Sequence, residues 1–246
     1  MTTVAVLADP PIEGFVLPDL AGGLLDESEA TALYIAMLGD VCRAVEASGA
    51  DLLVNYRPAD QVPGDVAPEA AIQEPLEAAL DAPGAARYEV QVGSSHAARV
   101  GNTVTHLLEQ EGVKTAAAVE PTAGLLTRQQ IDSAAMKLRS AETVLGPATE
   151  GRVYYAGFAQ PVDFEAAYAT PTVETLTDRA TDAGQSVDFL PTTPVVETPR
   201  DLLTVVPLLR SRRRGERVVP PRTTTLVEEY GLRVQGGADG PELVRE

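Results

Sequence analysis

The chain is poor in lysine, cysteine and tryptophan. Lys114 and Lys137 are the only lysines among 246 residues, tryptophan is absent, and Cys42 is the single cysteine. One cysteine excludes a disulfide framework or a thiolate metal cluster within one chain. No run approaches the roughly 18 consecutive apolar residues of a membrane span, and the first residues lack the basic-then-apolar layout of a signal peptide. We therefore expect a cytoplasmic protein with no membrane partner.

Positive charge of any kind is scarce. Asp and Glu number 36 against 19 Lys and Arg, which gives a formal net charge of −17. A nucleic-acid surface depends on clustered cations that meet phosphates, so nucleic acid is excluded as a partner. An acidic surface is also typical of proteins that stay soluble in concentrated salt, where screening removes most self-repulsion. We predict a halophilic, haloarchaeal protein, and an ordinary acidic mesophile protein remains the alternative.

Short apolar runs alternate with longer helical patterns along the chain. This alternation is typical of βαβ units and of a largely parallel sheet, so the predicted fold class is α/β. The predicted strands are residues 3–8, 51–56, 88–92, 114–120, 141–146, 152–158 and 186–190.

Helix starts are marked by capping residues. Asp26 with Glu29, and Thr127 with Gln130, have the spacing of a capping box, in which each side chain accepts a hydrogen bond from the other residue's backbone. The segment 68–80 has a helical pattern that Pro75 must kink or break. These signals place one helix between most pairs of predicted strands.

The composition changes after residue 209. We assign residues 1–209 to one α/β domain and residues 210–246 to a C-terminal basic segment and tail with at most one short helix. The run "RSRRRGER" is the only basic cluster. It is either a solvated helix end whose cations favour the helix dipole, or a contact for phosphate or a partner. A homo-oligomer in which the tail packs on a second subunit is left open.

Ligands of such sheets bind in the crevice at the carboxyl ends of the strands. The stretch "VLGPATEGRVYYAGF" (144–158) places a Gly146-Pro147 turn at one strand end, followed by Glu150 and Gly151. One interpretation is a loop that binds a sugar or an acceptor, with Gly151 allowing close approach. The other is a tight connection between strands whose charges face solvent.

Several segments resemble, in order, the motifs of one family. The stretch 144–158 resembles the pattern VLGPAxDGGYYLxGL of the DUF2064 family of uncharacterised proteins with a glycosyltransferase A type fold. "ADPPIEGFVLPDL" (8–20) resembles the family's nucleotide loop, "VEPTAGLLT" (119–127) a strand end, and "VVETPRDL" (195–202) a late motif. The resemblance spans about residues 3–205.

The resemblance implies a nucleotide-diphospho-sugar transferase type of domain. Its fold would be a Rossmann-like three-layer α/β/α sandwich, with a mostly parallel sheet and one antiparallel strand. The implied activity is binding of a nucleotide or nucleotide-sugar and transfer of a glycosyl group with Mg²⁺ or Mn²⁺. The implied metal ligands are Glu120 and Glu197, and Glu150 would orient or deprotonate the acceptor hydroxyl.

The resemblance also implies a set of substrate-binding residues. Arg99 aligns with an arginine of the family and would clamp phosphate, because its planar fork matches phosphate oxygens. One of the two tyrosines at 154 and 155 would pack in the core while the other stacks on a ligand ring. The remaining predicted substrate-binding residues are Gly14, Gly146, Pro147, Gly151, Arg152 and Tyr154.

The chain departs from the family at charged positions. Leu17, Pro18 and Asp19 stand where the family has basic residues, and Pro121 stands in place of its central Asp. These losses favour a non-catalytic module for nucleotide sensing or partner binding, whereas the retained 146–151 loop favours an enzyme. A nucleotidyltransferase-like enzyme is a further alternative. Both histidines, at 96 and 106, are interpreted as surface or helix residues.

Overall fold

Seven strands form one mixed sheet in the computed structural model, which describes residues 1–238 and 240–246. The strand order is β3-β2-β1-β4-β6-β5-β7. Strand β6 runs antiparallel to β4 and β5, and every other neighbouring pair is parallel. This confirms the predicted sheet. The strands are β1 (Thr2–Ala8), β2 (Asp51–Tyr56), β3 (Arg87–Val90), β4 (Thr115–Val119), β5 (Thr143–Pro147), β6 (Val153–Phe158) and β7 (Val187–Phe189).

Seven α-helices lie within the described residues, and the predicted caps begin two of them. Asp26 Oδ1 accepts from the backbone N–H of Glu29 at 2.8 Å, and Glu29 Oε2 accepts from that of Asp26 at 3.0 Å. Thr127 and Gln130 form the second predicted capping box. The helices are α1 (Glu27–Glu46), α2 (Pro68–Glu77), α3 (His96–Thr105), α4 (Arg128–Lys137), α5 (Thr172–Asp182), α6 (Pro199–Arg214) and α7 (Pro221–Glu229).

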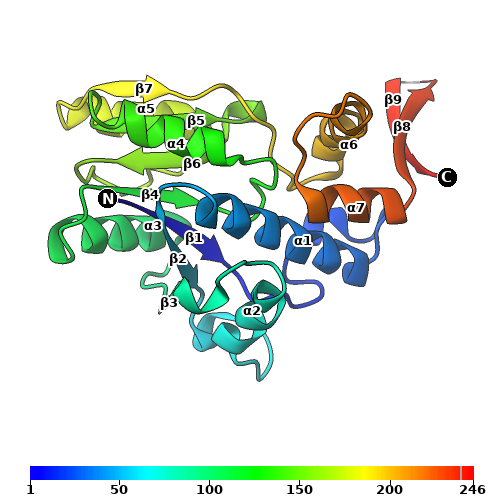
Figure 1. The fold of residues 1–246 in the computed structure, drawn as a ribbon, viewed down its shortest axis with the longest axis horizontal. Helices are drawn as coiled ribbons and strands as arrows, with labels where there is room; N and C mark the ends of the chain where they lie inside the picture. The colour runs from blue at the N-terminus through cyan, green and yellow to red at the C-terminus, as the bar shows by residue number, and fades with distance from the viewer. Residues whose placement is uncertain (239) are drawn as a thin grey trace.

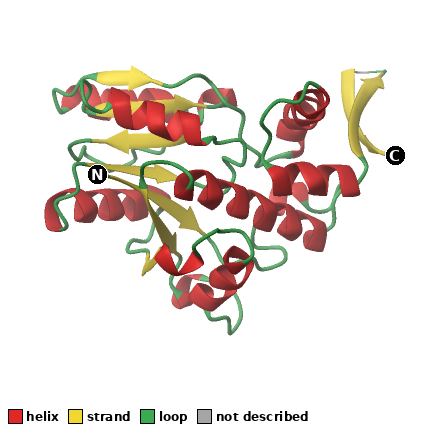
Figure 2. Cartoon of the chain, viewed as in Figure 1, coloured by secondary structure: helices red, strands yellow, loops and turns green. Residues whose placement is uncertain are grey.

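The helices cover both faces of the sheet. One apolar cluster joins the strands to α1, α2, α4, α6 and α7, and a second joins them to α3 and α5. All seven residues of β1 are buried, as is typical of a parallel strand covered by helices on both sides. The result is the predicted three-layer α/β/α sandwich, and Figure 2 shows the strands with helices packed around them.

The C-terminal segment differs from the prediction. Helix α6 continues through residues 209 and 210, so the predicted domain boundary falls inside a helix. Helix α7 follows, and then β8 (Leu232–Gly237) and β9 (Gly240–Arg245) pair as an antiparallel hairpin that the sequence did not predict. In Figure 1 this hairpin lies at the opposite side of the molecule from the N-terminus. The division into a domain and a tail stays a prediction.

Among the described residues, no helix combines the length and the apolar character that crossing a membrane would require.

Candidate functional site

Five polar or charged residues meet at one edge of the sheet because of where the strands end. Asp9, Arg57, Gln91 and Glu120 directly follow β1, β2, β3 and β4, which run parallel to one another. Arg152 directly precedes β6, and since β6 is antiparallel, its beginning lies at this same edge. The edge is therefore the one where open α/β sheets bind ligands.

Two cavities open at this edge. The central cavity has a volume of about 240 Å³ and the adjoining cavity about 100 Å³. Leu7, His96 and Glu120 line both, so the two are neighbours. The central cavity is also lined by Arg152, Tyr154, Tyr168, Thr170, Thr172 and Glu197, and the adjoining cavity by Asp9, Tyr34, Arg57, Gln91, Arg99 and Thr122.

Arg99 is a buried cation without a partner among the described residues. It lies in the first turns of α3, lines the adjoining cavity, and is only 6% exposed. Its Nε has no hydrogen-bond partner. Burial, followed by the charge of Arg57, lowers the pKa of the Arg99 guanidinium, and the nearby charges of Asp9 and Glu120 oppose this shift only in part. An unpaired buried cation is costly, so this position is suited to a ligand that brings negative charge.

A second arginine of the adjoining cavity is already neutralised. Arg57 donates from Nε and Nη2 to the two carboxylate oxygens of Asp9, at 2.5 and 2.8 Å. The hydroxyl of Tyr34 accepts from the backbone N–H of Asp9 at 2.7 Å, which fixes the loop after β1. Sequence reasoning gave Arg57 no role, although its position directly after a predicted strand was the signal that could have found it.

Glu120 lies where the two cavities meet. Its Oε1 is 3.1 Å from His96 Nε2, and 41% of its side chain is exposed. Desolvation raises the pKa of Glu120, and the charges of Glu197 and Asp9 add to this rise, whereas His96 and Arg99 oppose it. His96 is the first residue of α3, so it is a helix residue as predicted. Its ring also packs edge-on against Tyr168 at 4.6 Å and lines both cavities, which the sequence did not reveal.

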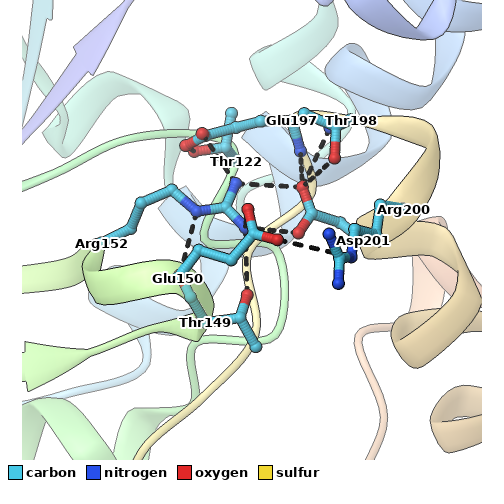
Figure 3. Close-up of polar contacts among 8 residues, drawn as sticks. All are labelled: Thr122, Thr149, Glu150, Arg152, Glu197, Thr198, Arg200 and Asp201. Carbon is cyan, nitrogen blue, oxygen red and sulfur yellow. Dashed lines mark hydrogen bonds and ion pairs between the residues drawn. The ribbon is translucent and has the colours of Figure 1, made fainter. Parts of the chain in front are cut away.

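Arg152 is the centre of an ion-pair cluster (Figure 3). Its Nη1 donates to Glu197 Oε2 at 2.9 Å and to Asp201 Oδ2 at 3.0 Å, and its Nη2 donates to Asp201 Oδ1 and to Thr149 Oγ1. Burial works to raise the pKa of Asp201, but Arg152 and the backbone N–H groups of Glu197 and Thr198 hold it below its usual value. The side chain of Asp201 is 4% exposed. Asp201 was not predicted as a site residue.

Glu150, predicted as the catalytic residue, lies at the rim of this cluster. Its Oε2 is 3.9 Å from Arg152 Nη2 and its Oε1 is 3.5 Å from Arg200 Nε, with half of its side chain exposed. It lines neither cavity. Its backbone is in the left-handed region, with φ 61°. The catalytic role of Glu150 stays a prediction.

Gly146 and Tyr154, both predicted to bind substrate, contact each other. A Cβ on Gly146 would lie 2.6 Å from the Tyr154 ring, so packing alone requires glycine here. The Tyr154 hydroxyl accepts from Gln130 Nε2 and donates to the carbonyl of Pro191, both at 3.0 Å. Tyr154 is 2% exposed and lines the central cavity. Its hydroxyl is therefore used within the chain, and only its ring can meet a ligand.

The remaining predicted loop residues line neither cavity. Gly14 has φ 72° and faces the carboxylate of Glu27. Gly151 also has φ 72°, and a Cβ there would lie 2.7 Å from Pro171. The carbonyl of Pro147 accepts from the backbone N–H of Thr193 at 3.0 Å. Each residue thus has a structural reason for its place, and their substrate-binding roles stay predictions.

The predicted metal ligands, Glu120 and Glu197, line the same cavity, but each is paired with another side chain. Glu120 faces His96, and Glu197 accepts from Arg152 at 2.9 Å and from Thr122 at 3.3 Å. A guanidinium this close repels a divalent cation, and Mg²⁺ demands near-ideal octahedral oxygen geometry. As arranged, these two residues do not fit the metal that was predicted for them. The prediction of Mg²⁺ or Mn²⁺ is not otherwise tested.

A different group has the spacing of metal ligands. The ligand atoms of Glu89, His106 and Glu111 lie within 4.8 Å of one another, and the described residues contain no other such group. Arg87, however, donates to both carboxylates, including two bonds of 2.7 and 2.8 Å to Glu111. The carboxylates thus already pair with an arginine, and none of the three residues lines either of the two cavities.

No family model and no curated protein matches the chain. Solved structures do. A protein from Desulfovibrio desulfuricans G20, provisionally assigned as a nucleotide-diphospho-sugar transferase, superposes with a TM-score of 0.75 at 21% identity, covering 93% of this chain and 94% of that one. A cytidylyltransferase from Leptospira borgpetersenii has a TM-score of 0.53 at 11% identity, covering 93% and 94%.

A third similar structure is a CMP:2-keto-3-deoxy-manno-octonic acid synthetase in complex with CTP. Its TM-score is 0.50 at 11% identity, covering 86% of this chain and 99% of that one. At these identities the likeness concerns the fold. The chain therefore has the fold of nucleotide-diphospho-sugar transferases and cytidylyltransferases.

Proposed function

We propose that the protein binds an activated nucleotide, a nucleotide-sugar, across the two cavities and transfers its glycosyl group. The fold supports this proposal, because the similar Desulfovibrio structure is assigned as a nucleotide-diphospho-sugar transferase. The position of the cavities at the carboxyl edge supports it as well. In this proposal the chain is a divergent, haloarchaeal member of the DUF2064 family and acts in the cytoplasm.

The observation that carries the proposal is the unpaired Arg99 guanidinium. It lies in the adjoining cavity beside Arg57 and Gln91, where it can donate to a diphosphate. Charge-assisted hydrogen bonds from arginine to phosphate are short and roughly twice as strong as neutral ones. The diphosphate would thus satisfy a group that the protein itself leaves without a partner.

Polar groups of the central cavity would then meet the transferred group. Glu120 and Glu197, exposed by 41% and 37%, can accept hydrogen bonds from sugar hydroxyls. Glu150, at the rim, would act on an acceptor hydroxyl only if the 149–151 loop brings it closer. Of the predicted features, the divalent cation has the least support, because the carboxylates of Glu120 and Glu197 already have partners.

Nucleotidyl transfer is the second candidate function. Two of the similar structures are named as a cytidylyltransferase and a CMP-linked synthetase, and one of them was determined with CTP. A third candidate function is a non-catalytic nucleotide sensor, which would bind the nucleotide at the same anion site and catalyse no reaction. The three functions share nucleotide binding at Arg99, and product analysis separates them.

The test is calorimetric titration of nucleosides, nucleoside diphosphates and nucleotide-sugars into the wild-type protein and Arg99→Gln. We expect Arg99→Gln to weaken diphosphate binding by about 10- to 100-fold, as befits loss of a charged hydrogen bond of about 1.5–3 kcal/mol. Nucleoside binding should change little. Arg128→Gln is the matched control, since Arg128 is 67% exposed and makes only a surface pair with Asp132. Equal weakening of nucleoside and diphosphate would remove Arg99 from the phosphate site.

A further inference from the structure

We infer that Arg152 supplies, from within the chain, the positive charge that a divalent cation would bring to the central cavity, so that the cavity works without a metal ion. This inference concerns the cavity's carboxylates, and it rests on the proposed function only for the identity of the anion that binds beside them.

Each carboxylate that lines the two cavities has its own partner. A site for a divalent cation needs several oxygen ligands that are free to coordinate the ion. Here each acidic side chain already contacts an arginine or a histidine on another element. The pairs are Asp9 with Arg57, Glu120 with His96, and Glu197 with Arg152.

The side chain of Arg152 is largely buried and is fixed by several hydrogen bonds. Its side chain is 19% exposed, and all three of its nitrogens donate to Thr149, Glu197 or Asp201. Figure 3 shows the guanidinium between the Glu197 and Asp201 carboxylates. Asp201 is itself fixed by the backbone N–H groups of Glu197 and Thr198, at 3.0 and 2.9 Å.

This geometry leaves a metal ion too few ligands. With Glu197 and Asp201 committed to Arg152, Glu120 is the remaining carboxylate of the central cavity. One carboxylate, itself 3.1 Å from His96, is a weak anchor for Mg²⁺ or Mn²⁺, which gain affinity from several charged oxygens. The fixed guanidinium also repels a dication that approaches Glu197.

The sharpest test is to create a metal site by removing Arg152. We expect wild-type protein to show no saturable binding of Mn²⁺ alone, measured as loss of the free Mn²⁺ electron paramagnetic resonance signal. Arg152→Ala frees Glu197 Oε2 and Asp201 Oδ1, while Asp201 Oδ2 keeps its backbone N–H bonds. The variant should therefore bind one Mn²⁺, with a rise in Tm of roughly 2–4 °C in millimolar MnCl₂. Arg152→Lys keeps the charge and should resemble wild type.

Two further variants keep the test decisive. Arg152→Gln retains hydrogen bonding to Thr149 and replaces Arg152→Ala if the latter does not fold. Arg128→Ala controls for loss of any arginine, and it should bind no Mn²⁺. Saturable Mn²⁺ binding by wild type that Glu197→Gln abolishes would overturn the inference, because the carboxylates would then hold a cation with Arg152 present. Absence of an acquired site in both Arg152→Ala and Arg152→Gln would overturn it too.

Pyrophosphate separates this inference from the proposed function. We expect wild type to bind pyrophosphate in excess EDTA, and Arg99→Gln to lose that binding. Binding that requires Mn²⁺ would contradict the metal-free cavity. If pyrophosphate and nucleoside diphosphates bind neither in EDTA nor with Mn²⁺, the proposed function is wrong, while the titrations with Mn²⁺ alone still decide the role of Arg152.

Discussion

Some single residues in this protein lower the stability of the folded state, and packing alone does not explain why they are there. Arg99 is a buried cation whose Nε lacks a partner among the described residues. Proteins place such groups where a ligand completes them, at some expense of stability in the free state. Arg152, by contrast, is surrounded by acceptors. The two arginines thus differ in their hydrogen bonding. The Arg99 Nε has no acceptor, whereas every nitrogen of the Arg152 guanidinium group donates to one.

Replacing Arg99 by an apolar residue of similar length should therefore stabilise the free protein. We expect Arg99→Met to raise the free energy of unfolding by about 0.5–2 kcal/mol, the range of single stabilising substitutions, while abolishing diphosphate binding. Urea unfolding followed by circular dichroism measures the first effect. A loss of stability would indicate that Arg99 has a structural partner and is not reserved for a ligand.

The Arg152–Asp201 pair gives stability a defined pH dependence. Because the folded pKa of Asp201 is held below the usual 3.8, its contribution is present above that value and is lost as pH falls through the lowered folded pKa. Asp201→Asn should cost about 3 kcal/mol at pH 7, as breaking a buried pair does. The difference from wild type should shrink below about pH 4 in unfolding titrations. A difference that is constant from pH 7 to pH 2 would contradict the pair's role.

At the scale of elements, one buried carboxylate joins the C-terminal segment to the sheet domain. Asp40 on α1 is 4% exposed, and it accepts from the backbone N–H groups of Arg222 and Thr223 at 3.1 and 2.8 Å. These N–H groups belong to the first turn of α7, so α1 provides the cap that α7 lacks in its own sequence. Burial raises the pKa of Asp40 despite these bonds.

Removing this cap should loosen α7 and the hairpin behind it. Asp40→Ala leaves two N–H groups of α7 without a partner, at a cost of about 1–3 kcal/mol. Hydrogen exchange should accelerate in α7 and β8 before it does in β1. Asp65→Ala, at an exposed position, is the control and should leave exchange unchanged. Unaltered exchange in α7 would show that apolar packing alone holds the segment.

The elements that could be predicted from the sequence are those with local signals. The capping boxes at Asp26 and Thr127 need only residues three positions apart, and buried strands show as apolar runs. The hairpin β8–β9 was missed because its glycines and proline, at 236, 237, 240 and 241, lower strand propensity. The Gly-Gly and Asp-Gly dipeptides at the junction of the two strands were turn signals that the prediction did not use.

The site was predicted less completely because its contacts are long-range. Five of the predicted residues line the two cavities, and their binding roles stay predictions: Glu120, Glu197, Arg99, Arg152 and Tyr154. No local pattern reveals that a guanidinium bonds a carboxylate 49 positions away. The sequence likewise does not show that the Tyr154 ring packs against residue 146 and so requires glycine there.

At the scale of the whole molecule, the net charge of −17 dominates behaviour in solution. Self-repulsion destabilises the folded state in dilute salt, and screening relieves it as the Debye length falls from about 10 Å at 0.1 M to about 3 Å at 1 M. We expect Tm to rise between dilute and multimolar KCl. A variant with Asp60, Asp65 and Glu109, all exposed, changed to Lys should show a smaller rise. An equal rise in both would assign the effect to general salting-out.

The central claim is that a diphosphate binds at Arg99 without a metal ion. Its most direct test is to map the anion site by nuclear magnetic resonance. Backbone amide shifts are recorded while a nucleoside diphosphate is added in EDTA. A diphosphate at Arg99 should shift amides of the first turn of α3 and of the residues that follow β1, β2 and β4. Shifts confined to the basic end of α6, at residues 212–214, would place the anion elsewhere and contradict the account.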